Sequence, residues 1–165
     1  MKNLFSPWRD TYTNGVHEHK KDECPFCFQI KEKNDDKNLI IVRSSSMIVM
    51  LNKHPYNAGH LLIVPIKHVA NLYDLDKNQQ QELMRLTTVS TKILKKTLQT
   101  DGINVGINLG KNAGGSIPQH LHMHVLPRWQ GDTTFMPLIA DTKVISSDMQ
   151  KIYQILQQEF KNSTP

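Results

Sequence analysis

The stretch His120-Leu121-His122-Met123-His124-Val125-Leu126-Pro127-Arg128-Trp129 alternates three histidines with three apolar residues, within a chain of 165 residues. Side chains alternate between the two faces of a β-strand, so the spacing places the three imidazoles on one face and the apolar residues in a core. Pro127 suits a strand end because it cannot donate to a ladder. We therefore expect a strand over residues 119–127.

Three imidazoles on one strand face indicate chemistry, because a solvated face is normally built from Lys, Glu and Thr. One metal ion bound by all three is awkward, since His120 and His124 lie about 13 Å apart along an extended backbone. Neutral imidazole can instead attack phosphorus or a carbonyl carbon, while a neighbouring imidazolium stabilises the developing negative charge. The strand predicts nucleophilic catalysis.

The preceding segment favours phosphorus as the atom attacked. A strand expected over residues 102–109 is followed by the glycine-rich segment Lys111–Pro118. Its glycines permit close backbone approach, and its N–H groups, together with Ser116 and Lys111, suit an anion. It is not a Walker A loop, because Lys111 is followed by Asn112 instead of Ser or Thr. We expect the loop to bind an anion beside the histidines.

Composition limits the class of protein. With 38% hydrophobic residues, the 165 residues suffice for a single domain and are too few to expect two, with residues 1–22 as an N-terminal arm. The start lacks the apolar stretch of a signal peptide and no run reaches transmembrane length, so we expect a cytoplasmic protein without membrane contact. The net charge of +5 suits an anionic substrate. The basic residues are spread along the chain, and nucleic-acid binding is not indicated.

Hydrophobic periodicity predicts an α+β domain with an antiparallel sheet. Further short strands are expected over residues 39–42, 47–51 and 60–65. A long helix begins at Asp76 with one apolar stripe. A final helix over 147–160 begins at Ser147-Asp148-Met149-Gln150, which has the pattern of a capping box. We expect the charged segment 34–38 to be a solvated loop.

The chain has two cysteines, Cys24 and Cys27. Their number excludes a disulfide scaffold and leaves a metal half-site, a redox pair or coincidence. The glutaredoxin motif that Cys-Pro-Phe-Cys looks like must follow an apolar strand, whereas the residues before Cys24 are polar. A zinc site needs two further ligands. His17 and His19 are near enough in sequence to substitute as ligands.

The histidine stretch resembles the His-φ-His-φ-His-φ-φ motif of the histidine triad (HIT) nucleotide-binding family. A second block, Met50–His68, is similar to the strand pair that forms the family's nucleoside pocket. Within the family the chain looks most like bacterial diadenosine tetraphosphate (Ap4A) phosphorylases, and the likeness covers roughly residues 8–136. The resemblance implies an HIT-like fold with one long and one C-terminal helix.

The resemblance also implies an enzyme that cleaves the phosphate chain of dinucleoside polyphosphates through a covalent nucleotidyl-histidine. His122 matches the nucleophile, and the remaining catalytic set is His60, His124 and Ser116. The substrate-binding set consists of Met50, Asn52, Leu62, Asn108, Gly115, Ser116, His124 and Trp129. Members with an N-terminal Cys-x-x-Cys bind zinc at positions that match His68 and His120, which implies a structural zinc on Cys24, Cys27, His68 and His120. For Met50 and Leu62, plain core packing is an equal alternative.

One departure concerns the final acceptor. Many dinucleoside hydrolases of the family carry Gly-Gln-Ser or Gly-Gln-Thr before the triad, whereas this chain has Gly115-Ser116-Ile117. The missing glutamine puts plain hydrolysis in doubt and agrees with phosphorolysis, in which inorganic phosphate is a co-substrate. Alternatives are a nucleoside phosphoramidate or adenylyl-conjugate hydrolase of the same fold, a non-enzymatic nucleotide-binding regulator, and a redox or metal-transfer protein centred on the cysteines.

A homodimer is the last expectation. Family members that this chain resembles pair through the long helix and an adjoining strand, which corresponds here to residues 103–109. In that strand Ile103, Val105, Ile107 and Leu109 fall on one face. If the strand lies at a sheet edge, it needs cover.

Overall fold

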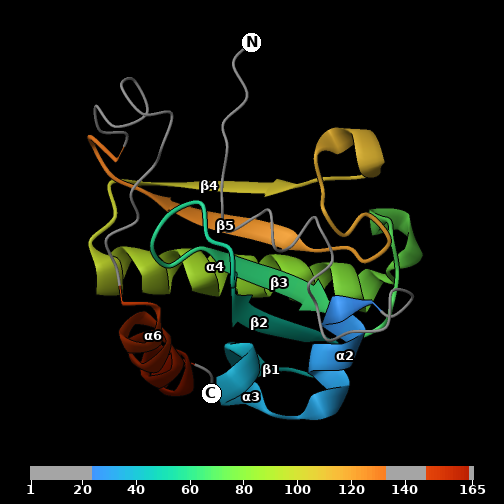
Figure 1. Cartoon of the computed structure of the whole chain (residues 1–165), viewed down its shortest axis with the longest axis horizontal. Helices are drawn as coiled ribbons and strands as arrows, with labels where there is room; N and C mark the ends of the chain where they lie inside the picture. The colour runs from blue at the N-terminus through green and yellow to red at the C-terminus, as the bar shows by residue number, and fades with distance from the viewer. Residues whose placement is uncertain (1–23, 133–147, 164–165) are drawn as a thin grey trace.

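Five strands form one antiparallel sheet in the computed structural model, which describes residues 24–132 and 148–163. The spatial order is β1-β2-β3-β5-β4, so β4 is an edge strand (Figure 1). The strands are β1 (Ile40–Arg43), β2 (Met47–Leu51), β3 (Leu61–Pro65), β4 (Gly102–Ile107) and β5 (Met123–Arg128). The expected α+β class with an antiparallel sheet is confirmed.

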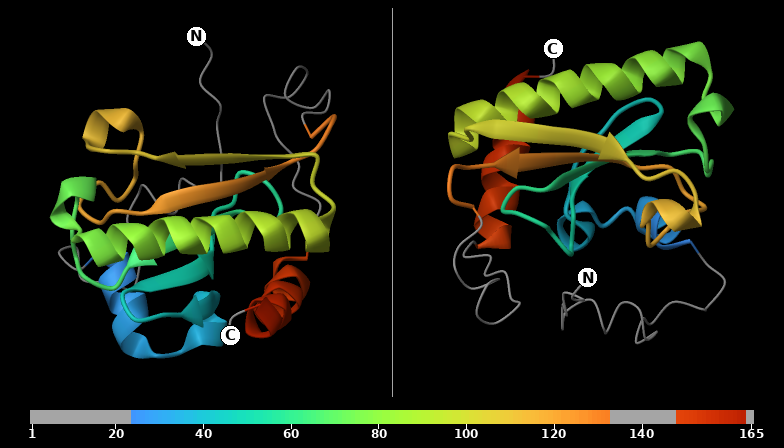
Figure 2. Two further views of the ribbon diagram at one scale, coloured as in Figure 1. Left: turned by 180° about the vertical axis from the view of Figure 1, so that it is seen from behind. Right: turned by 90° about the horizontal axis from the view of Figure 1, so that it is seen from above.

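Helices cover both faces of this sheet. The right-hand view of Figure 2 shows α4 (Lys77–Leu98) on one face and α2 (Pro25–Glu32) on the other. Alternate residues of β2 and β3 enter different cores: Ile63 packs in the larger core with α4 and α6 (Met149–Ser163), and Leu62 packs in a smaller core with Phe26 of α2. Both strands are apolar throughout because both of their faces are buried.

Helix α4 follows the sequence expectation closely. The Asp76 side chain accepts from the N–H of Gln79, whose own side chain accepts from the N–H of Asp76, so the first turn has a reciprocal cap. The apolar stripe is buried and consists of Leu83, Leu86, Ile93 and Leu94. Among the described residues, no helix combines the length and the apolar character that crossing a membrane requires.

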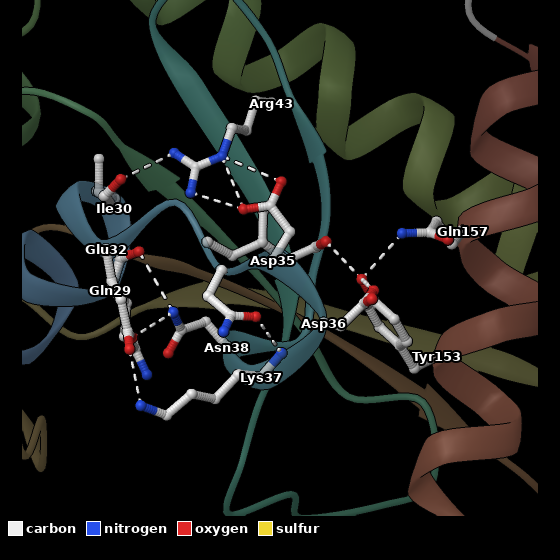
Figure 3. Close-up of polar contacts among 12 residues, drawn as sticks. Gln29, Ile30, Glu32, Asp35, Asp36, Lys37, Asn38, Arg43, Tyr153 and Gln157 are labelled. Atoms are coloured by element: carbon white, nitrogen blue, oxygen red, sulfur yellow. Dashed lines mark hydrogen bonds and ion pairs between the residues drawn. The ribbon is translucent and has the colours of Figure 1, made fainter.

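The C-terminal helix α6 begins at Met149, where the Asp148 side chain accepts from the N–H groups of Gln150 and Lys151. Ser147, the expected cap, lies outside the described residues. Buried Tyr153 joins α6 to the edge strand β1, because its hydroxyl lies 2.9 Å from Asp36 Oδ1, as Figure 3 shows, and 3.0 Å from the carbonyl oxygen of Ile40. Burial, helped by the Asp36 carboxylate, raises the pKa of Tyr153.

The expectation of a solvated loop over residues 34–38 is wrong. Residues Asp35–Asn38 form the short helix α3, and Asn38 is buried with its amide donating to Glu32. Asp35 pairs with Arg43 of β1 at 2.7 Å, as Figure 3 shows. The charges of this segment have partners within the chain, which a charge count cannot reveal. Within residues 24–132 and 148–163 there are also three short helical segments: α3, η1 (Leu72–Asp74) and η2 (Lys111–Ala113).

The histidine strand is shorter than expected. β5 begins at Met123, four residues later than the expected start, because residues 117–120 form a turn in which the N–H of His120 donates to the carbonyl of Ile117. The N–H of Leu121 donates to Val69 outside the sheet. The expected alternation is nevertheless present, since Leu121 packs in the larger core. The neighbouring strand β4 is also shorter than expected, because it ends at Ile107 instead of residue 109.

Candidate active site

The register of the sheet aligns several candidate residues on the face covered by α2. Met50 of β2 lies opposite Leu62 of β3, and Leu62 lies opposite His124 of β5. Met50 and Leu62 are buried in the smaller core with Phe26 and Ile117. One triad histidine therefore adjoins an apolar floor formed by two of the residues expected to line the base pocket.

Asn52 and the loop before His60 determine the protonation of His60. The Asn52 Oδ1 accepts from the N–H of His54 at 2.9 Å, so its amino group faces His60 Nδ1 at 3.2 Å. The N–H of Tyr56 also donates to His60 Nδ1, at 3.2 Å. A nitrogen that accepts from two donors carries no proton, and we assign the proton of neutral His60 to Nε2.

The assignment extends to the third triad histidine. His60 Nε2 lies 2.9 Å from His124 Nδ1 and donates to it, so the proton of His124 is on its own Nε2. That Nε2 is buried and has no hydrogen-bond partner among the described residues. A buried N–H without a partner is costly, which makes it a donor suited to a ligand oxygen.

His122 has the opposite tautomer. Its Nδ1 lies 2.8 Å from the carbonyl oxygen of His120 and must donate to it, which leaves the lone pair on Nε2. The ring is 6% exposed and lies between the rings of Phe26, at a centroid distance of 5.2 Å, and His124, at 4.9 Å. His122 thus holds a nitrogen lone pair beside the donor nitrogen of His124, which is the arrangement that a nucleophile and an oxyanion contact require.

Burial keeps these imidazoles neutral. Together with the smaller effect of repulsion from neighbouring imidazoles, burial lowers the pKa of His60 to about 3 and that of His124 to about 4. Burial also lowers the pKa of His122. Neutral rings are consistent with the tautomers assigned above. An imidazolium was the charge stabiliser expected from the sequence, whereas the structure offers the N–H of a neutral His124.

A second group of four residues, the Cys–His cluster, consists of Cys24, Cys27, His68 and His120. It adjoins His122 through His120, whose carbonyl accepts from His122 Nδ1. One candidate ligand atom from each residue, a cysteine sulfur or a histidine ring nitrogen, lies within 4.8 Å of the other three. Cys24 Sγ is 3.2 Å from His120 Nδ1, and Cys27 Sγ is 3.1 Å from His68 Nδ1. His120 donates from Nε2 to the carbonyl of Pro65 at 2.9 Å, which leaves the Nδ1 lone pair facing the thiols.

This cluster fits a metal ion. Two thiols and two imidazoles are the donor set of many tetrahedral zinc sites, and the carbonyl that accepts from His120 is the usual partner of a metal-bound histidine. His17 and His19, the alternative ligands considered from the sequence, lie outside the described residues. His120 belongs to both groups, because its ring faces the cysteines while its carbonyl orients His122.

The segment after β4 holds Asn108, Gly115 and Ser116, which the sequence predicts to bind phosphate. Gly115 lies against Asn108, whose side chain a Cβ at position 115 would approach to 3.4 Å. Ser116 is exposed, directly before buried Ile117. The structure brings Asn108 and Gly115 side by side, as the substrate-binding set implies.

Trp129 is not brought to the histidines within one chain. Trp129 follows His124 by five residues, which corresponds to roughly 17 Å between the two residues along an extended strand. Its indole N–H donates to the carbonyl of Leu98 at the end of α4. The neighbouring Arg128, considered for a distal phosphate, is held by Asp132 at 2.6 Å and by Asn104.

Two aromatic residues at the site were not expected from the sequence. Phe26 packs on both His120 and His122, and Tyr56 stacks on His124 with ring planes 22° apart. The position of Phe26 between the two cysteines was the available signal, because any residue inside a metal-binding turn is held near the ligands. For Tyr56, proximity to His60 in sequence was the only clue.

Comparison with known proteins agrees with the resemblance to the HIT family that the sequence motifs indicate. The family model described as the HIT domain matches residues 32–131. The chain is 39% identical over 166 residues to a protein named AP-4-A phosphorylase from Mycobacterium tuberculosis, which covers 97% of this chain and 85% of that protein. It is 35% identical over 92 residues to a bis(5'-adenosyl)-triphosphatase of Saccharomyces cerevisiae, covering 55% of this chain and 44% of that protein.

Solved structures share the fold. A zinc-bound histidine triad family protein from Mycobacterium smegmatis superimposes with a TM-score of 0.69 at 23% identity, covering 85% of this chain and 94% of that one.

Proposed function

Because the chain belongs to the HIT domain family, we propose that it is an enzyme that cleaves the phosphate chain of dinucleoside polyphosphates such as Ap4A through a covalent nucleotidyl-His122. One observation carries the proposal: Nδ1 of His122 donates to a carbonyl and leaves a lone pair on Nε2. The relatives named AP-4-A phosphorylase and bis(5'-adenosyl)-triphosphatase support the substrate class.

The first step forms the covalent intermediate. Nε2 of His122 attacks the α-phosphorus in line, a P–N bond forms, and the bond to the bridging oxygen breaks with its electron pair leaving on the departing nucleotide. From Ap4A this leaving group is ATP. The Nε2–H of His124 donates to an α-phosphate oxygen, and the hydrogen bond from His60 keeps His124 in that donor tautomer.

Other residues of the proposed site hold the substrate. The loop around Asn108, Gly115 and Ser116 donates to the phosphate oxygens. The floor formed by Met50 and Leu62 contacts the adenine. Asn52 contacts the ribose as well as His60. A contact of Trp129 with a second base stays a prediction.

The second step transfers the nucleotidyl group to an acceptor. Phosphate or water attacks the phosphorus, the P–N bond breaks, and the lone pair returns to His122. With phosphate the product is ADP, and with water it is AMP. The Gly115-Ser116-Ile117 sequence, which lacks the glutamine typical of many hydrolases in the family, supports phosphate as the acceptor.

Product analysis tests the function. We expect purified protein incubated with Ap4A to form ATP and ADP in equal amounts, and only when inorganic phosphate is present. ATP and AMP formed without phosphate would replace phosphorolysis by hydrolysis. No cleavage under either condition would overturn the proposed activity.

We further propose that the Cys–His cluster binds a structural zinc ion. Four protein ligands leave no open coordination position, so zinc would support the fold by joining α2, the segment after β3 and the turn before β5. The zinc-bound state of the M. smegmatis protein supports the choice of metal. Metal binding needs reduced thiols, which agrees with a cytoplasmic location.

A homodimer paired through β4 and α4 is the third part of the proposal. β4 is an edge strand, and Val105 in its middle is 46% exposed between Ile103 and Ile107, which pack on the larger core. Met84 of α4 is also exposed, at 55%. A twofold interface would cover the edge and these side chains. Sedimentation equilibrium at micromolar concentration should give twice the 19.0 kDa chain mass, and a monomer mass unchanged by nucleotide would contradict the dimer.

A further inference from the structure

Phe26 connects the Cys–His cluster to the histidine that we assign as nucleophile. Its side chain is 4% exposed, and its ring centroid lies 5.4 Å from that of His120 and 5.2 Å from that of His122. These two histidines are the acceptor and the donor of the hydrogen bond that fixes the tautomer of His122. Phe26 therefore contacts the donor ring of that hydrogen bond and the side chain of the residue whose carbonyl accepts it. We propose that Phe26 is a positioning residue that holds the His122 imidazole in its reactive orientation, an inference that rests on the proposed function.

The hydrogen bond alone does not define the ring position. A single contact at Nδ1 is a pivot about which the imidazole can tilt, and the tilt weakens the hydrogen bond to the carbonyl of His120 that fixes the tautomer. Phe26 contacts the ring at an interplanar angle of 55°, and His124 contacts it at 65°. With both neighbours present, the plane of the ring and hence the direction of the Nε2 lone pair are restricted. In-line attack on phosphorus requires that direction, and a misplacement of about 1 Å can cost on the order of a hundredfold in rate.

The turn that carries Phe26 is itself anchored on both sides. Cys24 is the N-cap of α2, Pro25 is at the first helical position, and Phe26 lies between the two cysteines of the cluster. Pro25 fixes the backbone angle at the start of this helix. Two of the four candidate ligands, Cys24 and Cys27, thus flank in sequence the residue that packs on His122. Behind Phe26, Ile40, Ile48 and Val64 fill the smaller core and restrict its rotamer.

A pair of matched variants separates positioning from general destabilisation. Phe26→Leu removes the flat ring and keeps an apolar side chain. Ile48→Ala removes atoms from the same core at a position on β2 that is not part of the proposed site. For each protein, purified with its metal, we would measure thermal unfolding, kcat and KM for Ap4A, and nucleotide-dependent stabilisation by AMP.

We expect both variants to melt at a lower temperature, and only Phe26→Leu to lose about tenfold or more in kcat with KM changed by less than about threefold. Phe26→Tyr keeps the ring and should restore most of kcat. If Phe26→Leu does not fold, Phe26→Met supplies a side chain of closer volume and carries the same expectation. A kcat loss in Phe26→Leu, or in Phe26→Met if Phe26→Leu does not fold, that is no larger than the loss in Ile48→Ala would overturn the inference.

A readout independent of turnover keeps this inference separable from the proposed function. In ¹⁵N-labelled protein, the two ring nitrogens of His122 should give the distinct shifts of an Nδ1–H tautomer. We expect these signals to broaden or move toward the averaged values of exchanging tautomers in Phe26→Leu and to stay sharp in Ile48→Ala. Unchanged His122 signals in Phe26→Leu would refute positioning, whereas a wild-type protein inactive on Ap4A would refute the function alone.

Discussion

Lowering the pH from about 7.5 to about 5 should reduce the free energy of unfolding by about 3 kcal/mol through His60 and His124. Burial lowers their pKa values to about 3 and about 4 in the folded protein, whereas both are near 6.5 in an unfolded chain. Between pH 6.5 and 4 the unfolded chain therefore binds protons that the folded protein does not. The stabilisation is complete above pH 6.5 and is lost as the pH falls toward the folded values.

The size of this loss in the free energy of unfolding follows from the difference between the pH and the unfolded-state pKa of about 6.5. At pH 5 the difference is about 1.5 pH units, which corresponds to about 2 kcal/mol for a fully buried histidine such as His60. We take about 1 kcal/mol for half-buried His124, because partial exposure screens its interactions. Urea unfolding followed by circular dichroism at the two pH values measures the sum.

His60→Gln is the control, since it removes one titrating ring and leaves the Cys–His cluster in place. The pH-dependent loss should be about 2 kcal/mol smaller in this variant than in the wild-type protein. Protonation of the four candidate metal ligands contributes equally to both proteins and cancels in the comparison. A wild-type stability that is the same at both pH values, or an equal loss in His60→Gln, would refute the reasoning.

Three further outcomes are expected. His122→Ala should lower turnover of Ap4A by at least about a thousandfold while the protein stays folded, and a residual rate above about a tenth of wild type would rule out His122 as nucleophile. Elemental analysis should find about one zinc per chain, removable by a chelator with a fall in melting temperature; a metal-free protein of equal stability would contradict the structural role. Tyr153→Phe should lower the free energy of unfolding by about 1 to 2 kcal/mol, because the Asp36 contact is lost, and should leave kcat unchanged. A fall in kcat of about tenfold, which corresponds to about 1.4 kcal/mol, would show that α6 acts on the site.

The alternation of β5 and the apolar stripe of α4 could be predicted from the sequence, because both depend on a local period. The limits of β5 could not, since the strand begins only after a turn closed by the His120–Ile117 hydrogen bond and a contact with Val69. The prediction for segment 34–38 was wrong for a similar reason: Asp35 finds Arg43 eight residues away, across α3 and the start of β1. Partners distant in sequence carry no local signature.

The candidate site shows the same division. The candidate histidines and cysteines could be found from the sequence and the family resemblance, because the triad histidines occupy every second position and two residues separate the cysteines. The direction of each hydrogen bond was not, because the tautomer of His60 depends on Asn52 and the backbone of Tyr56. Phe26 was not predicted because its only signal was its position between the two cysteines, and that position does not by itself reveal a contact with His122.

The pairing of Leu62 with His124 has a consequence for which sequence changes this protein can accept. An added or deleted residue in the exposed loop over 111–114, which precedes the proposed phosphate-binding residues Gly115 and Ser116, changes only the path between two strands. The same change between Met123 and Val125 would shift β5 by one position against β3, so that the remaining histidines would turn into the larger core and the apolar residues toward the nucleotide. Relatives should therefore differ in length within this loop and keep a constant length across β5, and an insertion scan through residues 108–127 should show an abrupt loss of folded protein at the start of the strand.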